Sequence, residues 1–157
     1  MNSEHEYEFF MQECDKHGKL LAGTTAKNLE VDFNGLRYSK AEGLDAIGKP
    51  KNIYTEKYSD SDRTRVYIPE NITNEPTTVK FTFYFIGDER QKTYHEFLEY
   101  VRKGFHRYYD TYRNKYLYFF VDSELKPAEE KLYGSVPYLK FELTVQNIFG
   151  KTFDVEG

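Results

Sequence analysis

Two aspartates separated by one residue, Asp60 and Asp62 in "YSDSDR", are the residues whose types and spacing come closest to a metal site. Such a pair binds a divalent cation when other oxygen ligands converge on it. The EF-hand arrangement also needs a third acidic or amide ligand, a glycine and a distal glutamate, none of which follows in "SDSDRTRVYI". We therefore predict an exposed acidic turn, with Arg63 and Arg65 pairing with these carboxylates or with a neighbouring chain.

The other groups that commonly perform catalysis form no recognisable motif. The chain has four histidines without H-E-x-x-H spacing, which are His5, His17, His95 and His106. The single cysteine, Cys14, is typical of a small buried side chain rather than of a nucleophile. The sequence lacks the signatures of nucleotide-binding loops and serine hydrolases, and no pair of carboxylates stands out as a glycosidase centre. We expect no catalytic residue, no metal and no cofactor, and the chain is not predicted to be an enzyme.

Length and composition predict one globular domain. A chain of 157 residues can bury a core without disulfides or a structural metal. Aromatic residues make up 18% of the chain, and this separates it from disordered proteins, which are poor in them. The sequence contains no apolar run of about eighteen residues and no signal-peptide pattern, so we expect neither a membrane span nor a leader.

The charge balance disfavours a nucleic-acid-binding protein. The net charge is −4, from 22 Lys and Arg against 26 Asp and Glu, whereas phosphate backbones require a concentrated basic face. The best local candidate is "KGFHRYYDTYRNKY" (Lys103–Tyr116), in which tyrosines alternate with basic residues. The alternative function is therefore a small nucleic-acid- or carbohydrate-binding module that uses the tyrosine-rich hairpin 105–118. We predict no sequence-specific nucleic acid partner.

The elements that must position any site are mostly strands. Strict alternation in "TTVKFTFYFIG" and "PYLKFELTVQNIFG" predicts two long strands, each with one apolar face. Their inward residues are Val79, Phe81, Phe83, Phe85, Leu139, Phe141, Leu143 and Val145. The segment "TRVYIPE" predicts a further strand that stops at Pro69, and "FHRYYD" and "KYLYFFVD" predict two strands around the turn "TYRN".

One amphipathic helix is predicted over residues 89–103. Asp88 is the expected N-cap, Gln91 the residue that reaches back to it, and Gly104 the residue that ends the helix. The apolar stripe consists of Tyr94, Phe97, Leu98 and Val101.

The remaining segments carry weaker signals. Residues 1–30 predict an N-terminal β-hairpin or arm, with a helix as the rival interpretation, and residues 154–157 are expected to fray. Residues 41–64 predict a long, partly irregular connection of the kind that serves binding or assembly, and residues 123–135 a polar connection. The expected fold is mainly β (α+β): an antiparallel β-sandwich or split barrel with one helix packed on it, in a single domain of residues 1–157.

Five stretches in order resemble a known family. They are "VDFNGLRY", "YSDSDRTRVYIPE", "GDERQKTYHEFLEYV", "YYDTYRNKY" and "PYLKFELTVQNIFGKTF". Together they resemble the N-terminal, ring-forming domain of the distal tail proteins of long-tailed phages and prophages, and the resemblance implies a tail-protein-like core over residues 31–153. The related tail tube and tail terminator proteins share much of this topology. The resemblance implies a hexameric ring that links the tail tube to the baseplate or tail fibre. It also implies partners such as tail tube or baseplate hub proteins, in the bacterial host cytoplasm during assembly and then in the virion tail.

A ring predicts interfaces between unlike faces of adjacent copies. We expect the Gly35–Thr64 loop and the edge strands to form them. Tyrosines on the polar face of the strands are suitable anchors, because each has a large apolar body and a polar tip. The candidate interface residues are Asp60, Asp62, Arg63, Arg65, Tyr84, Tyr108, Tyr112 and Tyr116.

Overall fold

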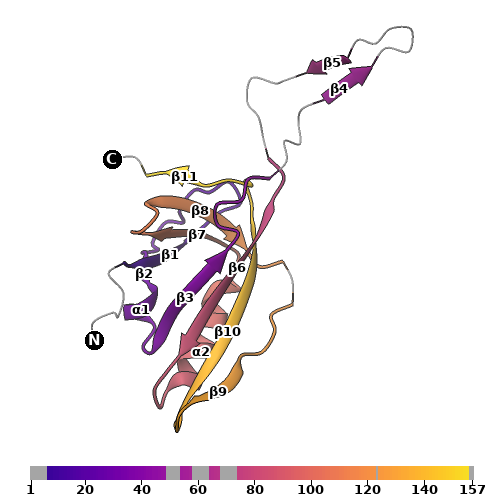
Figure 1. Cartoon of the computed structure of the whole chain (residues 1–157). Helices are drawn as coiled ribbons and strands as arrows, with labels where there is room; N and C mark the ends of the chain where they lie inside the picture. The colour runs from indigo at the N-terminus through magenta and orange to yellow at the C-terminus, as the bar shows by residue number, and fades with distance from the viewer. Residues whose placement is uncertain (1–6, 49–53, 58–63, 68–73, 123, 156–157) are drawn as a thin grey trace.

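The computed structural model of the chain describes residues 7–48, 54–57, 64–67, 74–122 and 124–155; for 54–57 and 64–67 it describes the backbone alone (Figure 1). Strand residues far outnumber helical ones, and the strands pair in antiparallel fashion. The strands are β1 (Phe9–Cys14), β2 (Lys27–Asn28), β3 (Leu36–Glu42), β4 (Tyr54–Lys57), β5 (Thr64–Tyr67), β6 (Thr77–Phe85), β7 (Phe105–Asp110), β8 (Lys115–Phe120), β9 (Glu129–Tyr133), β10 (Val136–Asn147) and β11 (Phe153–Asp154). The helices are α1 (Leu29–Asp32) and α2 (Arg90–Val101). The predicted mainly-β α+β class is confirmed.

Nine strands form one open, curled sheet. Its order is β2-β1-β7-β8-β10-β6-β3, with β11 added to β8 and β9 added to β10. The sheet has two halves that meet where β8 and β10 pair, at Gln146 with Phe120 and Asn147 with Phe119. Away from this junction the halves face each other, and the ring of Phe9 in β1 stacks on Tyr38 of β3 with 3.8 Å between centroids. The arrangement is therefore the split form of the expected fold, made from a single hydrogen-bonded sheet rather than two.

The core lies between the halves and follows the predicted alternation. The side chains predicted to point inward from β6 and β10 are all buried. The strands pair so that Phe83 lies opposite Phe141, which places the two apolar rows side by side. The other face of the same strands is polar, with an ion pair between Lys80 and Glu142.

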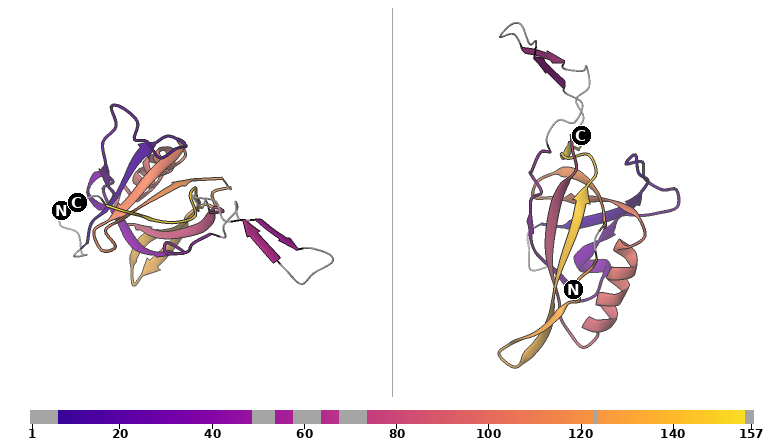
Figure 2. Two further views of the ribbon diagram at one scale, coloured as in Figure 1. Left: turned by 90° about the horizontal axis from the view of Figure 1, so that it is seen from above. Right: turned by 90° about the vertical axis from the view of Figure 1, so that its right-hand side faces the viewer.

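Helix α2 covers the open side of the curled sheet (Figure 2). Its buried residues are Thr93, Tyr94, Phe97, Tyr100 and Val101, so the predicted stripe is essentially right. Phe97 is the centre of this contact, with the ring of Phe83 at 5.0 Å and that of Phe33 at 5.3 Å. These ring contacts fix the helix to both β6 and the segment that follows α1.

The predicted cap of α2 is wrong. The residue before the helix is Glu89, whose side chain makes no capping hydrogen bond, and Asp88 lies one position too early. A turn at Gly87 takes the cap's place, because the Arg90 N–H and guanidinium both donate to the Gly87 carbonyl, at 3.3 and 3.1 Å. The helix also ends at Val101, two residues before the predicted Lys103.

The N-terminal segment belongs to the body of the fold. Strand β1 pairs with β7 along all six of its residues, and Met11 is fully buried. After β1 the chain turns back and pairs with it at two places only within the described residues. These are an isolated bridge between Cys14 and Leu20 and the two-residue strand β2. The Asp15 carboxylate fixes the turn by accepting the N–H groups of His17 and Lys19. Of the two predicted forms, hairpin or arm, β1 and β2 have the antiparallel pairing of a hairpin, and both strands belong to the nine-stranded sheet.

Four short elements were not predicted: the helix α1 and three strands. Strand β4 lies in the expected irregular connection, β9 in the expected polar connection, and β11 reaches into the tail that was expected to fray. Strand β11 lies against β8, because Phe153 pairs with Tyr116 and its ring packs on Tyr118 at 5.5 Å, while the Asp154 carboxylate makes an exposed pair with Lys115 at 2.9 Å. Strand β9 was not predicted because its sequence is mostly polar, and its residues stay largely exposed at the sheet edge.

The ladder of β4 and β5, called the arm here, stands away from the nine-stranded sheet (Figures 1 and 2). On the body side, Gly48 donates its N–H to the Gly150 carbonyl at 2.8 Å. A Cβ on either glycine would collide with the Glu75 carbonyl oxygen. We call Gly48, Glu75 and Gly150 the arm base. The chain therefore leaves the body after Gly48 and returns to nearly the same point at Glu75.

Candidate functional site

The predicted charged cluster falls mostly beyond the described residues. Asp60, Asp62 and Arg63 lie outside them. Arg65 lies in β5 of the arm, where its Cα pairs with that of Glu56, and its side chain is not described. The ion pairs predicted for these residues stay a prediction, and what is established is that Arg65 belongs to the arm.

The buried nucleophilic and titratable groups have environments that oppose ionisation. Burial, aided by the charge of Asp15, raises the pKa of the Cys14 thiol to about 11. Burial lowers the pKa of His106, whose ring stacks on Phe119 at 5.6 Å. Within the described residues, no three His, Cys, Asp or Glu side chains gather closely enough to hold a metal ion.

Three of the four candidate tyrosines lie at separate places on the surface. Tyr84 is half-buried in β6 and meets the Tyr138 ring at 5.5 Å. Tyr112 is 63% exposed in the β7–β8 turn and meets Tyr7 at 4.9 Å. Tyr116 is half-buried in β8. They therefore do not form one patch.

The fourth tyrosine, Tyr108, was wrongly expected on the polar face. It is buried in the core, and its ring meets Phe81 at 5.0 Å. The strand β7 alternates as expected, but both of its faces carry aromatic residues, and the buried set is His106, Tyr108 and Asp110. Burial raises the pKa of Tyr108 well above its ordinary value, so its hydroxyl stays protonated.

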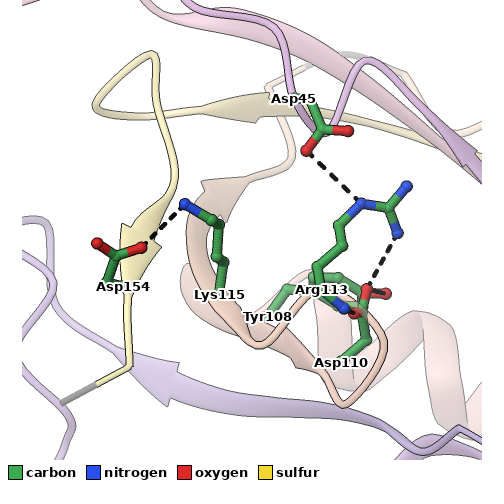
Figure 3. A network of polar contacts seen from close by, with 6 residues as sticks. All are labelled: Asp45, Tyr108, Asp110, Arg113, Lys115 and Asp154. Carbon is green, nitrogen blue, oxygen red and sulfur yellow. Dashed lines mark hydrogen bonds and ion pairs between the residues drawn. The ribbon is translucent and has the colours of Figure 1, made fainter. Parts of the chain in front are cut away.

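A polar network fixes the β7–β8 turn (Figure 3). The fully buried Asp110 carboxylate accepts the Tyr108 hydroxyl at 2.8 Å and the Arg113 N–H at 2.6 Å. The Arg113 guanidinium pairs with Asp110 at 3.3 Å and with Asp45, beyond β3, at 3.6 Å. Within this turn Asn114 has a positive φ of 55°, and its side chain accepts the Tyr109 hydroxyl at 2.8 Å. The network holds the hairpin against the segment that leads towards the arm base.

The tip of the β9–β10 hairpin exposes apolar side chains. Leu132, Tyr133 and Val136 surround the turn at Gly134, and Tyr133 is 83% exposed. Figure 1 shows this hairpin projecting from the opposite end of the body to the arm. The tip therefore combines three exposed apolar side chains on one projecting hairpin.

A second surface, which we call the aromatic depression, lies on the outer face of β1, β7 and β8. Its lining includes Phe10, Gln12, Ala26, Arg107, Tyr109 and Tyr116. The Tyr109 ring lies 5.5 Å from Tyr116 and 6.0 Å from Phe10, and the Arg107 guanidinium lies 4.0 Å from the centroid of Tyr116. Of these residues, only Tyr116 was named as a candidate interface residue, although the hairpin 105–118 of the alternative binding function also contains Arg107 and Tyr109. The alternation of side chains along a strand could have grouped these residues, because Arg107, Tyr109 and Tyr116 share the face opposite Tyr108.

No protein-family model matches the chain, and no curated protein matches it. Among the described residues, no helix combines the length and apolar character needed to cross a membrane.

Proposed function

We propose that this chain is a structural subunit of a phage or prophage tail, which assembles as a ring and links the tail tube to the baseplate or tail tip. The arm is the observation that carries the proposal, because a strand ladder that stands away from the body can reach a neighbouring subunit (Figure 1). Contacts between unlike parts of adjacent copies close into rings when the rotation between copies permits it.

The sheet edges add support. Strand β3 ends the nine-stranded path and is paired only with β6 within the described residues. An unpaired edge presents backbone N–H and C=O groups to another chain. The exposed charges of Lys40 and Glu42, which pair at 3.2 Å, limit uncontrolled pairing along this edge. A specific partner can still satisfy it.

The exposed hairpin tip supports the same role from the other end of the body. Leu132, Tyr133 and Val136 lie together at the tip and offer apolar surface that a neighbouring subunit can cover. A body with a projecting arm at one end and an apolar tip at the other has two unlike contact surfaces. Two such surfaces are what a closed ring or a stack of rings requires.

The place of the ring in the tail follows from the sequence resemblance. Six copies, a tail tube or baseplate hub partner, and passage from the host cytoplasm into the virion tail all rest on it. The role is structural, so the proposal assigns no catalytic residue and no cofactor.

The test compares the full chain with an arm-deleted variant in which a short Gly-Ser linker replaces residues 50–73. Because Gly48 lies against Glu75, the body can close over this linker. Light scattering after size-exclusion chromatography, over a range of concentrations, and negative-stain microscopy measure assembly, alone and with a tail tube protein. We expect rings from the full chain and monomers from the variant, which should keep the cooperative thermal unfolding of the nine-stranded body.

Two results would contradict the proposal at different levels. If the full chain stays monomeric at all concentrations and does not bind tail tube protein, the proposed tail function is wrong. Rings of equal size and stability from the arm-deleted variant would show that the arm does not form the ring interface. The sheet edge and the hairpin tip would then be the remaining candidates for that interface.

A further inference from the structure

The aromatic depression has the size and lining of a site for a single sugar ring. Its volume of about 230 Å³ is below the roughly 300–1,000 Å³ typical of sites for drug-sized ligands. Phe10, Tyr109 and Tyr116 are each half-buried, so their rings are held by neighbours while part of each surface stays open. Held aromatic surface of this kind packs against the apolar C–H face of a pyranose through dispersion.

Arg107 gives the depression a positive charge that has no carboxylate partner among the described residues. The guanidinium lies over the Tyr116 ring, so its position is fixed without an ion pair. Arg113, on the same hairpin, is by contrast held by Asp110 and Asp45. A guanidinium presents its donors in a planar fork that matches a carboxylate. Arg107 is thus available to bind an anionic group that enters the depression.

One wall of the depression is fixed by hydrogen bonds. The Gln12 amide donates to the Thr24 carbonyl at 3.2 Å, and the Thr24 hydroxyl donates to the Leu21 carbonyl at 2.6 Å. These bonds position the segment that leads to Ala26 beside the aromatic rings. Gln12 also lies opposite Arg107 in the pairing of β1 with β7. This wall of the depression and the Arg107 guanidinium therefore belong to adjacent strands. The site is therefore preorganised rather than assembled by the ligand.

We propose that the aromatic depression binds an acidic saccharide, with the sugar ring on Tyr109 and its neighbours and the sugar carboxylate on Arg107. This binding function goes beyond the ring assembly proposed above and does not depend on it. A single-stranded nucleic acid fits less well, because such binders track the phosphate backbone with several cations. Here Arg107 is one cation, the nearby Lys115 is held by Asp154, and the chain has a net charge of −4.

The test is a titration of the full-length protein, followed by nuclear magnetic resonance, with two acidic sugars and their neutral counterparts. Sialyllactose is paired with lactose, and digalacturonate with galactobiose. We expect at least one acidic sugar to bind and its neutral counterpart to bind more weakly. Arg107→Gln is expected to weaken acidic-sugar binding roughly 10- to 100-fold, the effect of losing a charge-assisted hydrogen bond.

Matched variants separate the site from the fold. Arg102→Gln removes an exposed arginine on α2 that pairs with Glu99, so it should leave binding and melting unchanged. Arg107→Lys keeps the charge but not the fork and should restore binding only partly. The melting temperature of each variant identifies any loss that comes from unfolding.

Three outcomes would overturn the proposal. The first is no shift of wild-type resonances by either acidic sugar at millimolar concentration. The second is equal binding of the acidic sugars by wild type and Arg107→Gln. The third is tighter binding of an oligothymidylate than of both sugars, which would make the depression a nucleic-acid surface.

Discussion

The Asp110 carboxylate should be among the most important polar groups for stability, and Asp110→Ala tests this. Asp110 is fully buried and accepts hydrogen bonds from the Tyr108 hydroxyl and from the backbone N–H of Arg113. The substitution leaves both donors without their acceptor, and each buried unsatisfied donor costs about 1–3 kcal/mol. The Arg113 guanidinium also loses its closer carboxylate. Together these losses predict a decrease of about 3–5 kcal/mol in the free energy of unfolding, as for other broken buried ion pairs.

The decrease can be measured by urea and thermal unfolding. The chain has 15 Tyr and no Trp, so tyrosine fluorescence and circular dichroism are the suitable signals. For a domain of this size, about 3–5 kcal/mol corresponds to a melting temperature lower by roughly 6–20 °C. Asp110→Asn keeps one acceptor oxygen and should cost less, about 1–3 kcal/mol.

The same hairpin provides a matched control. Asp154 also pairs with a cation, Lys115, but its side chain is 86% exposed (Figure 3). Water and salt screen such pairs, so Asp154→Ala should leave the midpoint unchanged within error. If Asp110→Ala unfolds at the same midpoint as Asp154→Ala, the assignment of Asp110 as the centre of a buried network is wrong.

Two further predictions follow from the buried titratable groups. With a pKa of about 11, Cys14 should react with a disulfide reagent at pH 8 far more slowly in the folded protein than in urea; equal rates would refute its burial. For His106, burial lowers the pKa below its ordinary value of about 6.5, so the unfolded chain binds more protons. Stability should be complete above about pH 6.5 and fall as the pH drops from there towards the lower folded-state pKa. In urea unfolding measured from pH 4 to 8, His106→Phe should show a smaller decrease in the free energy of unfolding at low pH. His95→Gln, at an exposed site, should show the same decrease as the wild type. Equal pH dependence in both variants would contradict the reasoning.

The fold was largely predictable where only one face of a strand is apolar. In β6 and β10 the polar residues alternate with aliphatic and aromatic ones, so the pattern itself selects the buried face. Helix α2 was predictable for a similar reason, since its stripe has helical spacing. The cap was not, because Gly87, Asp88 and Glu89 all suit a turn, and the choice among them depends on the Arg90 contacts.

The candidate site was less predictable, and β7 shows why. Tyr108 and Tyr109 are consecutive tyrosines, so one of them must be buried and the other must face outward. The sequence contains no signal that distinguishes them, and the choice depends on the Asp110 carboxylate in the core beside Tyr108. The partner strands also matter, because the aromatic depression unites Phe10 of β1 with two strands almost a hundred residues later. Local pattern carries no information on that pairing.

The arm base gives the chain a natural insertion point. Because Gly48 and Glu75 already lie against each other, the body determines the end-to-end distance of whatever joins them. The entropy of closing such a loop rises only slowly with its length, by about 0.6 kcal/mol for each doubling. The nine-stranded sheet can therefore carry segments of very different length and sequence between β3 and β6 with little change in its own stability. The same junction is the place to graft a foreign peptide or a fluorescent reporter without disturbing the sheet.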